Sequence, residues 1–130
     1  MLSFKLYFES LNKDELELNN LLNEAKGKGI DVFIYYKNKV ADLVHIRVPK
    51  DTSGLGTWFM DNLVRWADDN KIFIKLSAAR KGDLRSKDSK YKVPTSNRRL
   101  VDFYKRFGFV LNKGRNKRYE ISDTMYRDPR

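Results

Sequence analysis

Hydrophobic and polar residues alternate at the start of the chain and then change to a helical spacing. The alternation over residues 2–8 predicts a half-buried β-strand, and leucines three and four positions apart over 13–26 predict a helix that ends at two glycines. The β-branched and aromatic segments at 30–36 and 40–48 are separated by a polar turn at 37–39. This arrangement predicts a β-hairpin after the first helix.

The second half of the chain continues with alternating helical and strand patterns. In chain order we expect a polar, glycine-containing loop over 50–57, a helix over 58–67 that ends at 68–70, a strand over 71–78, an irregular charged segment over 80–95, a helix over 96–107, and short strands over 109–111 and 119–122. No repeat or linker divides the chain. We therefore predict a single α+β domain over residues 1–130, with a mixed, mostly antiparallel central sheet flanked by helices.

Composition excludes several kinds of chemistry. The 130 residues contain no cysteine and one histidine, so the sequence offers no disulfide, no thiolate metal site, no cysteine nucleophile and no multi-histidine metal site. We expect no metal cofactor. The first residues lack both a basic stretch and a continuous apolar run, so we expect no signal peptide or spanning helix and a cytoplasmic location.

Positive charge is concentrated in one part of the chain. The formal net charge is +10, and residues 80–118 hold 14 basic side chains and three acidic ones. Such a segment suits nucleic acid, an acidic protein surface or a phosphorylated cofactor, and the alternative is a solvated surface. Tyr91 lies among Lys87, Lys90 and Lys92, the composition of a nucleic-acid contact loop.

The loop before the second long helix has the composition of a phosphate-binding turn. Gly54 and Gly56 allow the backbone to approach a ligand, and the first N–H groups of a helix have no partner within the helix. The loop lacks the Gly-Lys-Ser/Thr ending of a Walker motif and the third glycine of a dinucleotide fingerprint. The alternative interpretation is a tight strand-to-helix turn.

The last predicted helix carries a second motif. One interpretation of its apolar face is an ordinary core helix, formed by Leu100, Phe103, Tyr104 and Phe107 and capped by Gly108. Asn97 followed by Tyr104 and then Gly108-Phe109, downstream of the glycine loop and a strand, resembles the Gcn5-related N-acetyltransferase superfamily. The resemblance covers about residues 40–122, and its compact form is similar to bacteriophage members.

The resemblance implies a fold, a cofactor and a mechanism. Acetyl-CoA would lie where the strand ending at Val48 separates from the strand at 72–78, and an N–H group near Val48 would polarise the thioester carbonyl. An amine would attack that carbonyl, Tyr104 would protonate the departing sulfur, and Asn97 would bind the pantetheine arm or a water. The implied cofactor-binding residues are Ile46, Val48, Ser53, Gly54, Leu55, Gly56, Thr57, Asn97 and Tyr104.

Two features depart from the family pattern. Asp51 stands where the loop usually begins with Arg or Gln, and a carboxylate there would oppose a pyrophosphate unless it turns outward or Lys50 compensates. The N-terminal half has one clear helix where the family commonly has two. The competing hypothesis is a non-enzymatic nucleic-acid-binding module with a vestigial cofactor cleft.

The sequence offers several candidates for the general base. His45 has a suitable ordinary pKa, although simple alternation places it with Leu43 and Arg47 on one face of a strand, as an ordinary strand residue. Asp42 and water are the other candidates.

Charge constrains the acceptor of the acyl group. The basic segment would repel polyamines, aminoglycosides and basic tails, so we expect an amine on a nucleic acid or on a protein with an acidic surface. Lys105 or Arg106 would contact the phosphates of coenzyme A.

Overall fold

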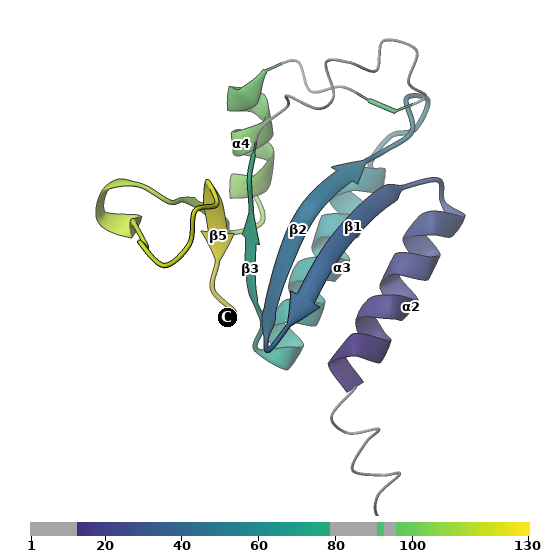
Figure 1. Cartoon of the computed structure of the whole chain (residues 1–130). Helices are drawn as coiled ribbons and strands as arrows, with labels where there is room; N and C mark the ends of the chain where they lie inside the picture. The colour runs from purple at the N-terminus through teal and green to yellow at the C-terminus, as the bar shows by residue number, and fades with distance from the viewer. Residues whose placement is uncertain (1–12, 79–90, 93–95) are drawn as a thin grey trace, which may run out of the picture.

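The computed structural model describes residues 13–78, 91–92 and 96–130, arranged as a sheet with helices packed against it (Figure 1). The elements in chain order are α2 (Lys13–Gly27), β1 (Asp31–Lys37), β2 (Val40–Arg47), α3 (Leu55–Asn70), β3 (Phe73–Leu76), α4 (Asn97–Lys105), β4 (Val110–Leu111), the 3-10 turn η2 (Gly114–Asn116) and β5 (Met125–Arg127). The strand predicted over 2–8 lies outside the described residues.

The five strands form one mixed sheet in the order β1-β2-β3-β5-β4. The β2–β3 pair is parallel and the other three pairs are antiparallel. This confirms the predicted α+β class with a mixed, mostly antiparallel sheet. In Figure 1, α3 lies behind β1 and β2, α2 lies beside β1 at the right and packs against α3, and α4 lies at the upper left next to β3.

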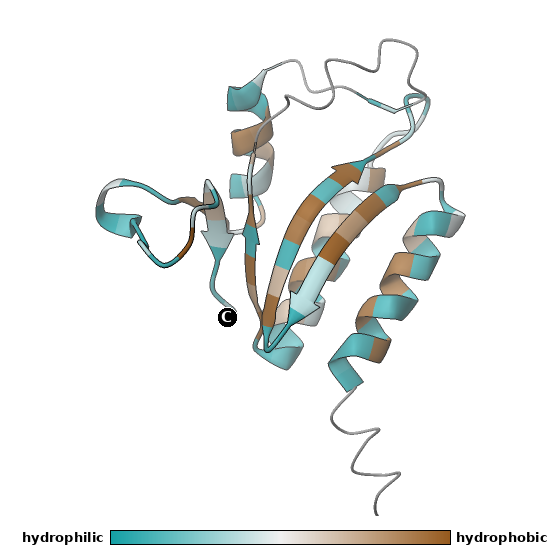
Figure 2. Cartoon of the chain, in the orientation of Figure 1, coloured by the Kyte–Doolittle hydropathy of each residue, from teal (hydrophilic) through white to brown (hydrophobic). Residues whose placement is uncertain are grey.

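The core lies between the sheet and these helices. Figure 2 shows hydrophobic residues along β1, β2 and β3 and more polar loops around them. The buried positions of β2 and β3 alternate with exposed ones and pack against the apolar stripe of α3. The largest fully buried side chains are Phe59, Phe109, Met60, Leu63, Ile72, Ile74, Leu76 and Met125.

The hairpin forms as predicted, with a two-residue turn. Asn38 and Lys39 both have positive φ, at 51° and 63°, as the tightest hairpin turn requires. Asp14 at the start of α2 fixes the lower end of this hairpin. Its carboxylate accepts hydrogen bonds from the Tyr36 hydroxyl and from Lys39 Nζ, the latter at 3.1 Å.

A β-bulge in β2 changes which side chains face the core. Phe33 pairs with His45, whereas the next residue of β1 pairs with Leu43, so Val44 is an extra residue in β2. Leu43 is therefore buried against the helices, while His45 is exposed on the open face beside Phe33. The expectation that Leu43, His45 and Arg47 share one face is wrong, because the bulge reverses the alternation after Leu43.

The helix after the glycine loop begins three residues earlier than predicted. Gly54 adopts the left-handed conformation at φ 77°, and its carbonyl accepts the Trp58 N–H at 2.9 Å. This bond closes the first helical turn, so the residues from Leu55 onward belong to α3. At its other end α3 continues to Asn70, where the left-handed Lys71 ends it.

The last strand is not where the sequence predicted it. Residues 119–122 belong to a loop, and the strand is Met125–Arg127. The pattern conceals this strand because it includes a charged residue, Arg127, that is only 4% exposed. Its guanidinium donates to both carboxylate oxygens of Asp68 at 2.7 and 2.9 Å and to the Phe107 carbonyl at 2.8 Å. These bonds compensate for burying the charge.

Candidate functional site

The parallel strands β2 and β3 stop pairing before β2 ends. Their ladder runs from Val40–Phe73 to Leu43–Leu76, whereas β2 continues to Arg47. The bulge at Val44 lies directly at this point, and bulges commonly redirect a strand beside a functional site. The last residues of β2, including Ile46, therefore have no pairing with β3.

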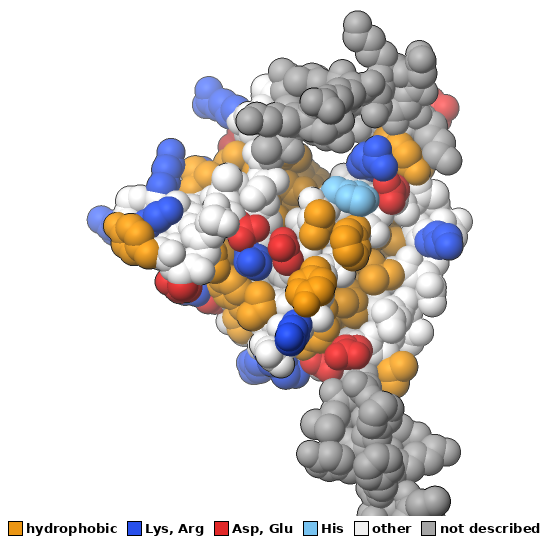
Figure 3. All heavy atoms as spheres, in the orientation of Figure 1, with side chains coloured by type: hydrophobic (Ala, Val, Ile, Leu, Met, Phe, Trp, Pro, Cys, Tyr) orange, Lys and Arg blue, Asp and Glu red, His pale blue; other side chains and the backbone are white. Residues whose placement is uncertain are grey.

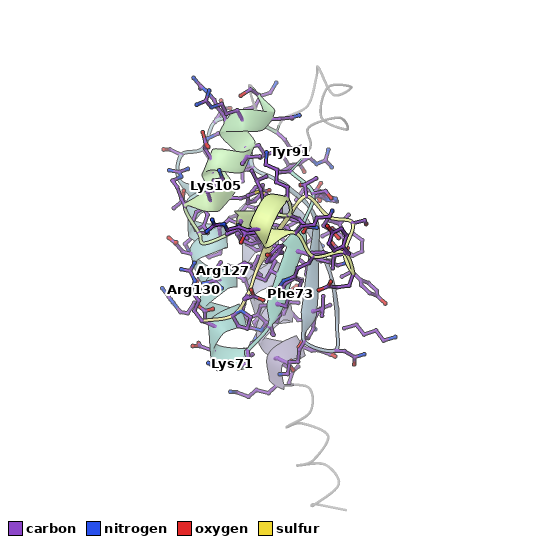
Figure 4. The ribbon with its side chains drawn as sticks, turned by 90° about the vertical axis from the view of Figure 1, so that its left-hand side faces the viewer. Lys71, Phe73, Tyr91, Lys105, Arg127 and Arg130 are labelled. Carbon is purple, nitrogen blue, oxygen red and sulfur yellow. The ribbon has the colours of Figure 1, made fainter. Side chains whose placement is uncertain are left out.

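A short segment from later in the chain lies against the end of β2. Tyr91 forms an antiparallel bridge with Pro49, and the Lys92 N–H donates to the Val48 carbonyl at 2.8 Å. The Arg47 guanidinium lies 4.8 Å from the centroid of the Tyr91 ring, which is half-buried (labelled in Figure 4). The Val48 carbonyl at the end of β2 is thus already hydrogen-bonded within the protein.

This packing changes the interpretation of Tyr91. The residue was expected to contact nucleic acid together with Lys87, Lys90 and Lys92, but its ring already contacts Arg47. Lys87 and Lys90 lie outside the described residues. The Tyr91 side chain therefore packs against the end of β2.

The first turn of α3 carries no negative group. No side chain caps it, and its first turn contains no acidic residue. Ser53 and Thr57 are exposed beside it. The first N–H groups of a helix point outward with the positive end of the helix dipole behind them, so this turn can receive an anion.

Asp51, which would oppose an anion there, is exposed in the preceding turn. That turn is closed by a hydrogen bond from Thr52 Oγ1 to the Pro49 carbonyl at 2.7 Å. Lys50 is exposed next to Asp51, as the compensation considered above requires. The exposure of the Asp51 carboxylate leaves it free to remain in solvent.

Three elements converge at Gly56 in the first turn of α3. A Cβ atom added to this glycine would lie 3.5 Å from Phe103 Cζ of α4 and 3.8 Å from Val48 Cγ1 at the end of β2. Both distances are ordinary van der Waals contacts, and the φ of Gly56 is not in the left-handed region. Glycine inside a helix costs about 1 kcal/mol relative to alanine. The fold does not explain why glycine occupies this position.

Two cations lie close to this turn. Lys28 Nζ is 4.9 Å from the centroid of the Trp58 ring, and Trp58 belongs to the first turn of α3. The Arg106 guanidinium is 5.2 Å from the centroid of the Phe103 ring, which faces Gly56. Arg106 was expected to contact the cofactor's phosphates. Lys28 was not, because it lies just after α2, thirty residues before Trp58 in the chain.

The motif of α4 is split between the two ends of that helix. Ser96 caps the helix by accepting the Arg99 N–H at 3.1 Å, and Asn97 is exposed in the first turn. Tyr104 lies two turns further on, about 10 Å along the axis, and is 6% exposed. Its ring packs edge-on against Phe109. Asn97 and Tyr104 therefore mark an outer and an inner position along α4.

The His45 ring lies against a carboxylate, a contact that the sequence did not predict. Its Nε2 lies 3.3 Å from Asp31 Oδ1, and the other carboxylate oxygen of Asp31 accepts the Arg47 Nε–H at 2.9 Å. Burial raises the pKa of Asp31, but the hydrogen bonds from Arg47 and His45 outweigh it and lower that pKa below its ordinary value. The contact between His45 and Asp31 depends on the register of the hairpin, and the bulge sets that register.

Asp42, the other candidate base, lies within the paired part of the sheet. It is the register partner of Lys75 in β3, whose Nζ is 3.3 Å from Asp123 Oδ1. Burial and the nearby charge of Asp123 raise the pKa of Asp42, and Lys75 opposes that effect. The carboxylate therefore binds a proton more tightly than an exposed aspartate does.

The described part of the chain shows neither a metal-binding group nor a helix of transmembrane character. No three histidine, aspartate or glutamate side chains in it are grouped to hold a metal ion. None of its helices combines the length and apolar character needed to cross a bilayer. Comparison with protein-family models, curated proteins and solved structures gives no match for this chain.

Proposed function

We propose that the chain is an N-acyltransferase of the Gcn5-related type, which transfers an acetyl or another acyl group from acetyl-CoA to an amine. The observation that carries this proposal is the convergence at Gly56 of the uncapped first turn of α3, the end of β2 and the motif helix α4. It occurs beside the point where β2 extends past its pairing with β3. The resemblance places the pyrophosphate of coenzyme A at such a helix turn and its acyl arm beside such a strand, and a helix N-terminus suits the pyrophosphate charge.

The glycines of the loop serve the cofactor's pyrophosphate. The backbone N–H groups over 53–57 would bind it, and Lys28 and Arg106 would neutralise the remaining phosphate charge. A glycine at position 56 allows phosphate oxygens to approach the backbone, which explains a residue that the fold itself does not require.

The chemical step needs one bond to form and one to break. The amine nitrogen attacks the thioester carbonyl, whose oxygen is polarised by a backbone N–H near Ile46 or Val48, and the C–N bond forms as the C–S bond breaks. Tyr104 gives its proton to the departing sulfur. His45, oriented by Asp31, is our candidate to take the proton from the amine, with Asp42 as the alternative.

The acceptor follows from the charge of the chain. Its excess of basic residues over residues 80–118 favours an amine carried by an anionic macromolecule, either a nucleic acid or a protein with an acidic surface. Small polycationic amines would be repelled from the same region.

Calorimetric titration with acetyl-CoA and with free coenzyme A tests the cofactor site. Gly56→Asp places a carboxylate in the first turn of α3. The helix dipole stabilises this charge, but the carboxylate repels a pyrophosphate. We expect micromolar binding to the wild type, no binding to Gly56→Asp and an undiminished free energy of unfolding for that variant. Asn20→Asp, which adds the same charge on the exposed side of α2, is the control and should bind normally.

Absence of coenzyme A binding by the wild type would contradict the proposal and favour the non-enzymatic hypothesis. If the cofactor binds, Tyr104→Phe tests the transfer step by thiol release in the presence of amine-bearing proteins and nucleic acids. We expect the variant to bind coenzyme A normally and to transfer the acyl group about 100-fold more slowly. Equal transfer rates would exclude Tyr104 as the general acid.

A further inference from the structure

The loop between β4 and β5 exposes an aromatic ring among cations. Tyr119 is 87% exposed, more than any other large hydrophobic side chain of the described residues. Lys113, Arg115 and Lys117 are exposed on the same loop, and Lys117 Nζ lies 5.6 Å from the centroid of the Tyr119 ring. Figure 3 shows Lys and Arg side chains beside an exposed apolar one where this loop projects from the sheet, at the left.

The backbone of this loop is fixed by the buried side chain of Asn112. Its amide group donates to the carbonyls of Arg118, Ile121 and Asp123 at 3.0 to 3.3 Å. Its carbonyl oxygen accepts the Arg118 N–H at 2.6 Å. These hydrogen bonds hold the loop in one conformation before a partner binds. That conformation keeps the Tyr119 ring exposed to solvent.

The fourth cation of the loop has a structural role. The Arg118 guanidinium lies 4.4 Å from the centroid of the Tyr126 ring and 5.3 Å from that of Phe73, and it pairs with Asp128 at 2.6 Å. The other three cations take part in none of the ion pairs found among the described residues. Their charges are available to a partner.

We propose that this loop binds single-stranded nucleic acid, with one base stacked on Tyr119 and the neighbouring phosphates on Lys113, Arg115 and Lys117. Cations alone would suit any polyanion, but an exposed ring on the same loop suits an unpaired base, because every base has a face that can stack on an aromatic ring. A duplex keeps its base faces stacked inside the helix, where Tyr119 cannot reach them. The inference does not depend on the acyltransferase activity.

Oligonucleotide binding followed by fluorescence anisotropy tests the stacking contact. We expect a labelled single strand to bind more tightly than a duplex of the same length, and Tyr119→Ala to weaken single-strand binding about tenfold. Tyr119→Phe keeps the ring and should bind like the wild type. Tyr35→Ala is the matched control, because Tyr35 is 58% exposed on β1, where its cross-strand partner is Asp42 rather than a cation.

The salt dependence tests the phosphate contacts. Replacing Lys113, Arg115 and Lys117 together by alanine should reduce the slope of log affinity against log salt by about 2, at roughly 0.7 for each phosphate contact to a single strand. The control variant, with Lys13, Lys26 and Lys37 replaced by alanine, removes the same charge from other exposed positions and should keep the slope.

Three results would overturn the proposal. These are no binding of the single strand by the wild type at low salt, equal affinity of the wild type and Tyr119→Ala, and competition by polyglutamate as effective as that by an unlabelled oligonucleotide. The last result would assign the loop to an acidic protein.

Discussion

A glycine lies close to each end of α3, but the fold accounts for the glycine at one end only. Near its C-terminal end, Gly108 has φ 94°, and an added Cβ would lie 2.6 Å from Arg130 Nη2. The backbone and the packing both demand glycine there. At the N-terminal end, Gly56 has neither a positive φ nor a close neighbour. Gly108 is required by the fold, whereas Gly56 is accounted for only by the proposed cofactor site.

Arginine and asparagine show the same contrast. Arg127 is buried and bonded to Asp68 and to a backbone carbonyl, whereas Arg106 is exposed over an aromatic ring. Asn112 is buried with its amide fully used, whereas Asn97 is exposed at the start of α4. Polar side chains whose hydrogen bonds the fold satisfies stabilise it, whereas Arg106 and Asn97 are exposed and belong to the site that we propose.

Replacing the two arginines by methionine tests the contrast at its largest effect. Arg127→Met removes the guanidinium donors of the Asp68 carboxylate and the Phe107 carbonyl and leaves Asp68 only the Arg130 backbone N–H. We expect it to lower the free energy of unfolding by about 3 to 5 kcal/mol. Arg106→Met removes the same charge from the surface and should change stability by less than about 0.5 kcal/mol. Urea unfolding followed by circular dichroism measures both. Equal losses would contradict the contrast.

The asparagines should differ in the same direction. Asn112→Ala removes hydrogen bonds to both carbonyl and N–H groups of the β4–β5 loop, so we expect a loss of about 2 kcal/mol. Asn97→Ala should leave stability within about 0.5 kcal/mol of the wild type. The same unfolding measurement applies, and a stable Asn112→Ala protein would show that solvent replaces the side chain.

The sequence predicted those elements whose apolar spacing decides their structure. The first helix, the hairpin and α4 formed close to where expected, because the apolar spacing of the helices and the polar turn between the two strands are local signals. The bulge at Val44 and the strand containing Arg127 were not predictable. The first depends on how β1 and β2 pair, and the second on a carboxylate from α3.

The candidate site divides in the same way. Gly54 and Gly56 stood out because glycines between a strand and a helix form a local pattern. Lys28 and Asp31 could not be found in this way. Lys28 contacts Trp58 of α3 from the end of α2, and the position of Asp31 beside His45 depends on the bulge in the hairpin. Local motifs thus identify the part of a site that the backbone makes, and tertiary contacts supply the charges around it.

Replacing Gly108 and Gly56 by alanine should change the free energy of unfolding in opposite directions, and by less than the replacements of Arg127 and Asn112 do. Gly108→Ala forces a left-handed residue to carry a Cβ and displaces Arg130, so we expect a loss of about 1 to 2 kcal/mol. Gly56→Ala adds ordinary contacts within a helix and should raise the free energy of unfolding by about 0.5 to 1 kcal/mol. Thermal unfolding compares the two variants. A destabilised Gly56→Ala protein would mean that the fold itself requires that glycine.

Two aspartates extend the comparison to pH, and the signs of their effects are opposite. Hydrogen bonds from Arg127 hold the pKa of Asp68 below its ordinary value, despite burial. Its ionised form therefore stabilises the fold above the ordinary pKa, and this contribution is lost as the pH falls through the lowered value. For Asp42, burial and Asp123 raise the pKa, so its ionised form costs stability above the raised value and the cost disappears on protonation.

Replacing each aspartate by asparagine separates these contributions. Asp68→Asn should lower the free energy of unfolding at neutral pH and flatten its decline below about pH 4. Asp42→Asn should raise that free energy at neutral pH by up to about 0.5 kcal/mol, with the difference from the wild type shrinking in acid. Urea unfolding across this pH range measures both. If Asp42→Asn lost stability at neutral pH, Lys75 would be the dominant influence on Asp42, and the carboxylate would be too well paired to serve as a base.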